Sequence, residues 1–376
     1  MKLAFFAISD WYLFNFRRAL AEYLLNQGLE VIMISAPGDY GSRLQSLGFR
    51  WFPIPMDRRS INPARESRTI MRLARLLRRE KVDLVHNFTI KAVVYGGVAA
   101  QLSGTSCRVH AVTGLGYVFT GESLQARLLR VPVALMFKMA LSGEKTRLIL
   151  QNPDDVEFFQ KMHLISKERI RLIRGSGVNV DRFNPLLRTP RNDGAFRVLL
   201  ASRLLWDKGI SEYVQAAGIL REAGRAVEFL LAGAQDNGNP SSVSQEQVEL
   251  WRREGVVTLL GHVDAMESVL KYINAAVLPT SYGEGVPRAL LEAAACGLPL
   301  IATDVPGCRE IVMHKVNGLL IPCHDSRALA DAIAFLMDNP ERCKEMGIAS
   351  RRKVVDEFDE RLVFQRTSEV YSEVNR

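Results

Sequence analysis

Some features that often reveal a protein's class are scarce in this sequence. Its five cysteines form no Cys-x-x-Cys pair, which argues against a disulfide framework or a zinc site and favours reduced thiols in a cytoplasmic protein. No apolar run reaches the ~18–20 residues that a membrane-spanning helix needs. The first residues, MKLAFFAIS, show no convincing signal-peptide cleavage site, so we interpret them as a buried strand.

Motifs for several common chemistries are missing as well. There is no Ser-His-Asp signature, no Walker A motif, and no GxGxxG dinucleotide fingerprint after the first strand. No cluster of potential ligands has metal-site spacing, so we expect no metal and no cofactor. Asp154 and Asp155 fit the first turn of a helix better than a metal site. His110 fits a packed histidine in a strand.

The positive charge is concentrated in one half of the chain. The net charge is +8, but residues 1–188 carry 28 Lys and Arg against 15 Asp and Glu, whereas residues 189–376 carry 21 against 26. A basic half indicates an anionic partner there. Nucleic acid, a membrane surface and a phosphorylated substrate are the candidates.

Short apolar runs alternate with helical patterns along the chain. We expect strands at 2–9, 29–35, 82–86, 107–112, 147–151, 196–202, 227–233, 256–261, 275–280 and 299–304. Such alternation predicts parallel βαβ sheets, hence an α/β fold with two doubly wound domains facing a central cleft. Ligands are expected beyond the carboxyl ends of the strands. The polar segment 183–194 is the expected linker between domains 1–186 and 187–359.

A basic turn follows the expected strand at 196–202. Arg203 and Lys208 lie just before Gly209, where the next helix opens. Free amides at a helix start attract anions, and a guanidinium with an ammonium suits a diphosphate. The alternative is a solvated turn whose cations pair with Asp207.

The stretch SYGEGVPRALLEAAACG, residues 281–297, carries two glutamates. Glu284 lies in the turn before a helix, and Pro287 suits the first helical position. Glu292 lies among leucines and alanines, so its carboxylate needs a partner. One candidate is Arg288 four residues earlier. The other is the pair of vicinal hydroxyls of a ribose.

Three segments of the first half follow expected strands. Asn15 and Arg17 lie in the aromatic stretch WYLFNFRR, which suggests either a surface for a larger substrate or packing of the first helix. A glycine-rich loop occupies 113–121. Lys91 follows the strand at 82–86 and is a candidate for a phosphate contact.

Two basic helical segments explain the charge of the first half. Residues 67–81 carry Arg68, Arg72, Arg75 and Arg79, and residues 123–143 carry Arg127, Arg130 and Lys138. Basic helices with apolar flanks are typical of membrane-surface elements, although an ordinary core helix remains the alternative for each. Nucleic acid is not expected as a partner, because aromatic residues are not interleaved with these cations.

Five segments in order resemble retaining glycosyltransferases of family 4, which have the GT-B fold of two Rossmann-like domains. They are SDWYLFNFRRAL, TGLGYVF, GSGVNVDRF, SRLLWDKGI, and EGVPRALLE followed by GLPLIATDVPGCREIV. The resemblance spans almost the whole chain. It is greatest for bacterial enzymes of capsule, O-antigen and glycan assembly, which add a hexose or N-acetylhexosamine to an undecaprenyl-diphosphate-linked sugar.

The resemblance implies a role for each donor-side residue. Arg203 and Lys208 would neutralise the diphosphate leaving group of a UDP-sugar, so that no metal is required. Glu284 would hold sugar hydroxyls and Glu292 the ribose. The remaining donor contacts implied are Gly285, Val286 and Pro287. Arg203, Lys208 and Glu284 are the catalytic set.

On the acceptor side, the resemblance implies Asn15, Arg17, Lys91, Thr113 and Gly114. Many relatives have a histidine where this sequence has Thr113, which leaves the sugar contact at that position open. The C-terminal segment, about 360–376, is expected to form a helix that packs back on the first domain.

The expected partners are a UDP-sugar, a polyprenyl-diphosphate-linked saccharide and an anionic membrane surface. We therefore expect a cytoplasmic protein peripherally associated with the inner face of the plasma membrane. A GDP-mannose-type donor is the alternative for the same fold. A catalytically silent sugar-nucleotide-binding scaffold is a further alternative, disfavoured because Arg203, Lys208, Glu284 and Glu292 are all present.

Overall fold

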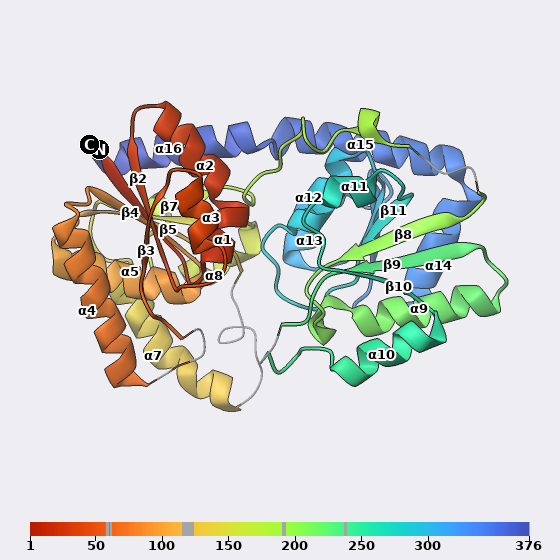
Figure 1. The fold of residues 1–376 in the computed structure, drawn as a ribbon, viewed down its shortest axis with the longest axis horizontal. Helices are drawn as coiled ribbons and strands as arrows, with labels where there is room; N and C mark the ends of the chain where they lie inside the picture. Colours follow the sequence, from red (N-terminus) through yellow and green to blue (C-terminus); the bar gives the residue numbers. More distant parts are fainter. Residues whose placement is uncertain (58–59, 61, 115–123, 190–192, 237–238, 376) are drawn as a thin grey trace. The chain divides into compact units, whose positions relative to one another are not determined.

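The chain divides into two compact units in a computed structural model (Figure 1). The structure describes residues 1–57, 60, 62–114, 124–189, 193–236 and 239–375, with only the backbone described at 124–129. Unit 1 comprises Met1–Ser176 and Val363–Arg376, and unit 2 comprises Gly177–Leu362. Unit 2 thus begins ten residues before the expected position, 187, because Val178, Val180 and Phe183 are buried in its core.

Unit 1 is built on a parallel sheet of seven strands in the order β3-β2-β1-β4-β5-β6-β7. Its strands are β1 (Lys2–Phe6), β2 (Glu30–Ser35), β3 (Arg50–Pro53), β4 (Leu84–Phe88), β5 (Cys107–Ala111), β6 (Thr146–Leu150) and β7 (Ile170–Leu172). Its helices are α1 (Asp10–Phe16), α2 (Arg18–Asn26), α3 (Gly41–Ser46), α4 (Pro63–Arg79), α5 (Ile90–Ser103), α7 (Leu124–Ala140), α8 (Pro153–Lys161) and the 3-10 turn η1 (Lys167–Arg169).

Unit 2 has a parallel sheet of six strands in the order β10-β9-β8-β11-β12-β13. Its strands are β8 (Phe196–Ala201), β9 (Val227–Ala232), β10 (Thr258–Gly261), β11 (Ala275–Leu278), β12 (Leu300–Thr303) and β13 (Gly318–Ile321). Its helical elements are η2 (Pro185–Leu187), η3 (Trp206–Lys208), α9 (Ile210–Glu222), α10 (Gln245–Glu254), α11 (Met266–Leu270), α12 (Arg288–Ala295), α13 (Pro306–Ile311), α14 (Ser326–Asp338) and α15 (Pro340–Glu357).

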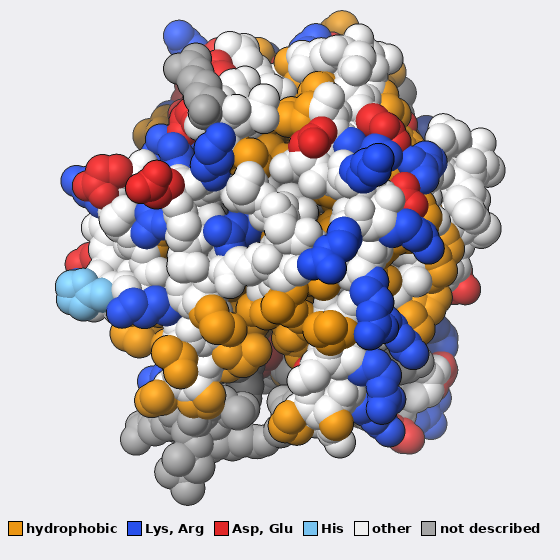
Figure 2. Space-filling model, turned by 90° about the vertical axis from the view of Figure 1, so that its left-hand side faces the viewer, with side chains coloured by type: hydrophobic (Ala, Val, Ile, Leu, Met, Phe, Trp, Pro, Cys, Tyr) orange, Lys and Arg blue, Asp and Glu red, His pale blue; other side chains and the backbone are white. Residues whose placement is uncertain are grey.

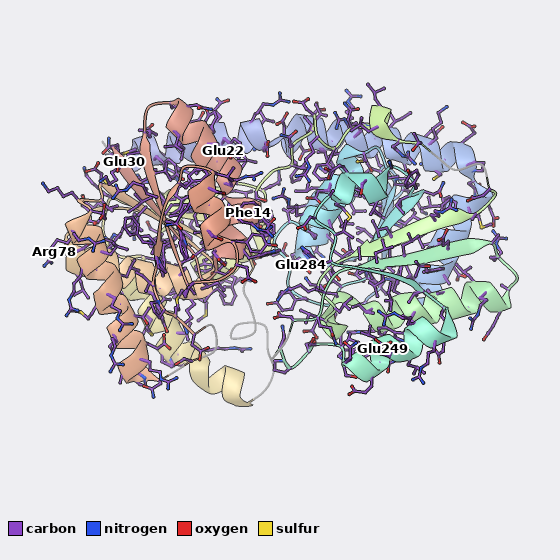
Figure 3. The ribbon with its side chains drawn as sticks, in the orientation of Figure 1. Phe14, Glu22, Glu30, Arg78, Glu249 and Glu284 are labelled. Carbon is purple, nitrogen blue, oxygen red and sulfur yellow. The ribbon has the colours of Figure 1, made fainter. Side chains whose placement is uncertain are left out.

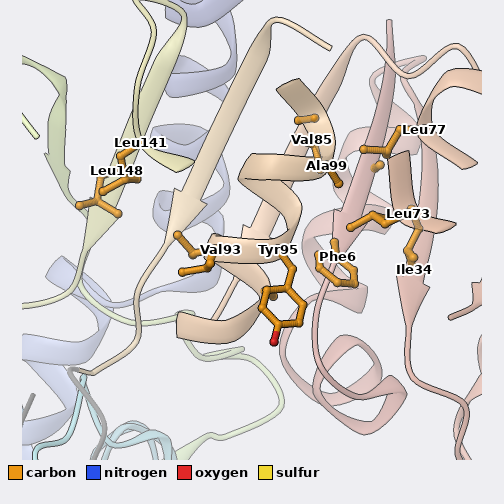
Figure 4. Close-up of a cluster of buried hydrophobic side chains, with 14 of the residues drawn as sticks. Phe6, Ile34, Leu73, Leu77, Val85, Val93, Tyr95, Ala99, Leu141 and Leu148 are labelled. Atoms are coloured by element: carbon orange, nitrogen blue, oxygen red, sulfur yellow. The ribbon is translucent and has the colours of Figure 1, made fainter. Parts of the chain in front are cut away.

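Each sheet is buried on both faces, as the near-continuous apolar strands predict. In unit 1, one core lies between the sheet and α4, α5 and α7, and includes Phe6, Leu73 and Tyr95 (Figure 4). The core on the other face packs against α1, α2 and the last helix, α16 (Glu360–Asn375). The expected α/β fold with two doubly wound sheets is confirmed.

Helix α16 leaves unit 2 and packs on unit 1. Tyr371 is buried there, with its hydroxyl 2.6 Å from Nδ1 of His86 in β4. Glu373 accepts hydrogen bonds from Arg147 and Arg171 at 3.0 Å each. Both ends of the chain therefore belong to the same unit.

Each sheet has one switch point. It lies between two neighbouring strands from which the chain continues toward opposite edges of the sheet. In unit 1 it lies between β1 and β4, and in unit 2 between β8 and β11. The loops that leave the carboxyl ends of such strand pairs separate and leave a crevice for ligands. These two places are where substrate-binding residues are expected.

Candidate active site

The switch point of unit 2 carries the main candidate site. The loop after β8 supplies Arg203 and Lys208, and the loop after β11 supplies Glu284. Figure 3 shows Glu284 beyond the carboxyl ends of the strands of this unit. Two segments about 80 residues apart in sequence are therefore brought together by the sheet, as the doubly wound fold predicts.

Lys208 and Glu284 form an ion pair between these loops. Nζ of Lys208 donates to Oε1 of Glu284, and both side chains are largely buried, with 11% and 14% exposed. The ammonium also lies 5.1 Å from the ring centroid of Tyr282. A partly desolvated ion pair of this kind costs free energy to bury, so its place at the switch point of the sheet points to function.

Hydrogen bonds lock the two loops around this pair. The carbonyl oxygen of Asp207 accepts from the amide of Ser281 at 3.0 Å and lies 2.9 Å from the Thr280 hydroxyl. The same hydroxyl lies 3.2 Å from Oε1 of Glu284. Lys208 and Glu284 are consequently held by backbone contacts on either side rather than on free loop tips.

Two glycines allow the loops to approach this closely. Gly209 has φ 74° and ends the turn before α9, and a Cβ built there would lie 2.0 Å from the Pro279 carbonyl oxygen. A Cβ at Gly307, in the first turn of α13, would lie 1.5 Å from the Gly285 carbonyl oxygen. Any side chain at either position would push the Glu284 loop away from its neighbours.

Arg203 is turned to a different carboxylate. Its guanidinium is exposed and pairs with Asp236, in the loop after β9. The alternative prediction from the sequence, a solvated turn in which the cations pair with Asp207, named a different carboxylate. The helix that follows, α9, has no side-chain cap on its amino end among the described residues. The uncapped amides of a 13-residue helix and two nearby cations favour an anion here.

The turn Gly285–Pro287 is buried and leads into α12. The sequence predicted Pro287 as the first helical residue, but Pro287 is the N-cap and the helix begins one residue later, at Arg288. The carbonyl oxygen of Pro287 accepts a hydrogen bond from the Leu291 amide at 3.2 Å. Val286 is 9% exposed. Packing against the core beneath the Glu284 loop therefore fixes the backbone of this turn.

Glu292 has the nearer of its two proposed partners. Its Oε1 accepts from Nε of Arg288 at 2.8 Å, one turn earlier on α12, and the two side chains are 15% and 26% exposed. This pair explains how the carboxylate is tolerated among apolar neighbours. Its ribose contact stays a prediction.

The acceptor-side candidates occupy several places in unit 1. Arg17 lies at the junction of α1 and α2 and is buried, and Nδ2 of Asn15 donates to the Trp11 carbonyl at 3.0 Å. Thr113 and Gly114 follow β5 and are half-buried. The rest of the glycine-rich loop, from 115, lies outside the described residues.

Lys91 anchors a loop of unit 1. Its Nζ donates to the carbonyl oxygens of Asp57 at 2.5 Å and Ser60 at 2.9 Å, and lies 3.3 Å from a carboxylate oxygen of Glu66. These contacts already use its charge and donors. A phosphate contact from Lys91 therefore stays a prediction that requires some of them to be replaced.

His110 is a core residue, as expected. It is fully buried in β5, with Nδ1 3.2 Å from Nδ2 of Asn87. Burial, with a smaller effect from the positive charge of Arg108, lowers the pKa of His110 to about 3. The imidazole is therefore neutral at physiological pH. Among the described residues, no group of three or more His, Cys, Asp or Glu is arranged to hold a metal ion.

Sequence reasoning missed Tyr282, Thr280 and Asp236 as parts of this site. Tyr282 and Thr280 lie two and four residues before Glu284. Their position in the same strand-to-helix turn was the sequence feature that could have identified them. Asp236 lies in the loop after β9, and only the order of strands brings it to Arg203.

Comparison with known proteins decides the family. A model described as "Glycosyl transferase 4-like" matches residues 2–152, and one described as "Glycosyl transferases group 1" matches residues 188–353. Together they account for most of the chain. The chain is a family 4 glycosyltransferase.

Two curated relatives of this glycosyltransferase act on undecaprenyl-diphosphate-linked sugars. One, from Campylobacter jejuni, is an N,N'-diacetylbacillosaminyl-diphospho-undecaprenol alpha-1,3-N-acetylgalactosaminyltransferase, 26% identical over 100% of this chain and 99% of the relative. The other, from Escherichia coli, is a UDP-Gal:alpha-D-GlcNAc-diphosphoundecaprenol alpha-1,3-galactosyltransferase, 29% identical over 82% of this chain and 80% of the relative.

Solved structures share the fold of this glycosyltransferase. HepE from Anabaena, in complex with UDP-glucose, matches with a TM-score of 0.79 and 19% identity, covering 99% of this chain and 100% of that one. Sucrose-phosphate synthase from Thermosynechococcus elongatus matches with a TM-score of 0.80 and 22% identity over 100% and 99%. The GT-B fold is thereby confirmed.

Proposed function

We propose that this glycosyltransferase moves a hexose or N-acetylhexosamine from a UDP-sugar to a polyprenyl-diphosphate-linked saccharide during polysaccharide assembly. The observation that carries the proposal is the buried Lys208–Glu284 pair at the switch point of unit 2. The named substrates of the two curated relatives support the acceptor and donor classes.

In this proposal the donor lies along the loops of unit 2. Arg203, Lys208 and the amino end of α9 take the diphosphate, because cations and free helix amides stabilise the charge that develops on a leaving group. Glu284 accepts hydrogen bonds from sugar hydroxyls, and Glu292 from the ribose. The amides of Gly285 and Val286 and the N-cap Pro287 border the sugar and phosphate.

The reaction retains the configuration of the sugar. The acceptor hydroxyl attacks the anomeric carbon on the face from which the diphosphate departs. The bond from that carbon to the diphosphate oxygen breaks as the new glycosidic bond forms, and the hydroxyl proton passes to the departing diphosphate. Lys208 and Arg203 lower the barrier by neutralising that leaving group, which leaves no step that requires a metal.

Unit 1 takes the lipid-linked acceptor at an anionic membrane surface. The exposed face of α4 carries Arg65, Arg68, Arg72, Arg75 and Arg79. On α7, Val131, Leu135 and Met139 are 75%, 68% and 48% exposed. The face drawn in Figure 2 has basic side chains along one edge and hydrophobic side chains gathered near them. Arg127 lies outside the described side chains.

This combination of cations and exposed apolar side chains supports peripheral binding to the inner face of the plasma membrane. No described helix is long and apolar enough to cross a membrane.

A screen of nucleotide sugars against short prenyl-diphosphate-linked acceptors tests the proposal. We expect transfer from one UDP-sugar, without added metal and with retained configuration. Transfer from GDP-mannose alone would overturn the donor assignment. Binding of a nucleotide sugar without transfer to any acceptor would instead identify a scaffold.

A further inference from the structure

The switch point of unit 1 holds a buried cation, Arg17, that forms no ion pair with a carboxylate of the described residues. Arg17 lies between α1 and α2, beyond the carboxyl end of β1, and is 6% exposed. Its guanidinium carbon lies 4.3 Å from the ring centroid of Phe88, the last residue of β4. β1 and β4 are neighbouring strands whose outgoing loops diverge at this switch point, so Arg17 lies where a doubly wound sheet receives a ligand.

The contacts of Arg17 leave part of its hydrogen-bonding capacity unused. Nη2 donates to the Tyr12 hydroxyl at 2.7 Å, and the guanidinium also lies 5.4 Å from the Tyr12 ring centroid. Nε is buried and has no hydrogen-bond partner, and no carboxylate among the described residues pairs with this arginine. A desolvated guanidinium normally has an anionic partner in a folded protein.

The neighbouring groups do not supply that anion. His86 contacts Tyr371, and burial, followed by the positive charge of Arg17, lowers the pKa of His86 well below its usual value. Asp10, at the start of α1, makes its hydrogen bonds to other groups. Its carboxylate accepts hydrogen bonds from the amides of Trp11, Tyr40 and Gly41 at 2.8–2.9 Å. The contacts of His86 and Asp10 are therefore made with groups other than Arg17.

The helix that starts beside Phe88 also favours an anion. Thr89, the N-cap of the 14-residue α5, has φ 74° and ψ 158°, a conformation that side-chain-bearing residues rarely adopt. Among the residues that the structure describes, its buried hydroxyl has no hydrogen-bond partner and no side chain caps the helix. The first turn carries Lys91 and no acidic residue. Within α5 itself, no side-chain cap and no first-turn acid compensates the partial positive charge of this helix end, and Glu66 of α4 pairs with Lys91.

We propose that Arg17 and the amino end of α5 receive the diphosphate of the lipid-linked acceptor. This rests on the proposed function, and it assigns the charged part of the acceptor to a subsite of unit 1. A planar guanidinium offers two parallel donors to phosphate oxygens, and the free amides of α5 supply more. The same chemistry would also suit free diphosphate, so the test must separate the two sources.

Equilibrium binding to the full chain provides that test, with saturating UDP present to occupy the donor site. The probes are farnesyl diphosphate, farnesol and inorganic diphosphate, and the variants are Arg17→Gln and Arg17→Lys. Arg18→Gln is the matched control, because Arg18 is the adjacent cation and already lies 3.5 Å from Glu22.

We expect farnesyl diphosphate to bind more tightly than farnesol and inorganic diphosphate. Arg17→Gln should weaken farnesyl diphosphate binding by about tenfold or more, the effect of one lost charge-assisted hydrogen bond, without changing farnesol binding. Arg17→Lys should lose part of the affinity for farnesyl diphosphate, since lysine keeps the positive charge but lacks the two parallel N–H donors of the guanidinium. Arg18→Gln should bind as the wild type does.

Thermal unfolding distinguishes a ligand-binding role from a structural one. Removal of an unpaired buried charge should leave the Tm of the unliganded protein unchanged or higher while abolishing the Tm increase caused by farnesyl diphosphate. Unchanged farnesyl diphosphate affinity in Arg17→Gln, or in Arg17→Lys if the first variant does not fold, would overturn the proposal. Equal affinity for inorganic diphosphate would overturn the acceptor assignment. None of these readouts requires sugar transfer, so they stand apart from the proposed function.

Discussion

The ammonium of Lys208 forms an ion pair with the carboxylate of Glu284. The two residues are proposed to contact different parts of one donor, the diphosphate and the sugar. We therefore expect the diphosphate to take the place of Glu284 at Lys208, an exchange that would release the Glu284 carboxylate for the sugar hydroxyls. Recognition of the leaving group and recognition of the sugar are thereby coupled.

Lys208→Ala should lower turnover by about 10²–10³-fold, because the charge that develops on the leaving group loses a buried cation. Steady-state transfer rates check this. Lys271→Ala is a matched control in the same unit, since Nζ of Lys271 lies 4.7 Å from the Tyr272 ring without any proposed substrate contact. Near-normal turnover in Lys208→Ala would remove Lys208 from the catalytic set.

Glu284→Gln should separate affinity from catalysis. Because the competing carboxylate is removed, we expect UDP to bind several-fold more tightly, while transfer from the UDP-sugar falls. Calorimetric titration with UDP and a transfer assay measure the two effects. Glu249→Gln removes a carboxylate that pairs with the exposed Arg252 and should change neither. Weaker UDP binding in Glu284→Gln would contradict the exchange.

Glu292→Gln tests whether the carboxylate serves the ribose or only its neighbour. A lost charge-assisted hydrogen bond to ribose should weaken UDP binding by about 10–100-fold and leave inorganic diphosphate binding unchanged. Arg288→Gln removes the other half of the ion pair and should affect UDP much less. If the two variants weaken UDP binding equally, Glu292 acts only through Arg288.

The charge of α4 should determine binding to anionic vesicles. Replacement of Arg68, Arg72, Arg75 and Arg79 by Gln removes four exposed cations, each worth about 1 kcal/mol near an anionic surface. Sedimentation with phosphatidylglycerol-containing vesicles should then show release of the protein. The control variant changes four exposed arginines of unit 2, namely Arg252, Arg253, Arg327 and Arg342. Equal vesicle binding by the α4 variant and the wild type would exclude α4 from the membrane face.

Asp155 should make unit 1 less stable as pH rises. Burial raises the pKa of its carboxyl from 3.8 to about 6, although Asn152 hydrogen bonds oppose the shift. The folded state therefore binds more protons than the unfolded state between about pH 4 and 6, and the free energy of unfolding falls across that range by about 1–3 kcal/mol. Asp155→Asn should remove this decline in denaturant titrations, whereas the exposed Asp154→Asn should keep it.

Much of the fold could be predicted from local sequence, because strands buried on both faces are apolar runs. Each expected strand overlaps an observed one. The sequence reasoning missed β3, β7 and β13: Arg50–Pro53 ends in proline, and Ile170–Leu172 has only three residues. The strand Gly318–Ile321 has four residues and follows the short helix α13. Pairing with neighbouring strands creates such elements, and local propensity does not reveal it.

The candidate site was predictable only in part. Glu284 and Lys208 stood out as charged residues in strand-to-helix turns, but their ion pair depends on the strand order of the sheet. The Arg288–Glu292 pair followed from helical spacing alone. The burial of Arg17 against Phe88 could not be predicted in this way, since Phe88 comes from a distant part of the chain.

The placement of α16 has a consequence for the order in which the protein forms during synthesis. The core of unit 1 includes Val363, Phe364, Val370, Tyr371 and Val374, which are synthesised after the whole of unit 2. Unit 2 is a continuous segment and can complete its core earlier. The usual amino-to-carboxyl order of domain folding is thus expected to be reversed, because residues 1–176 complete their core only once α16 has been made.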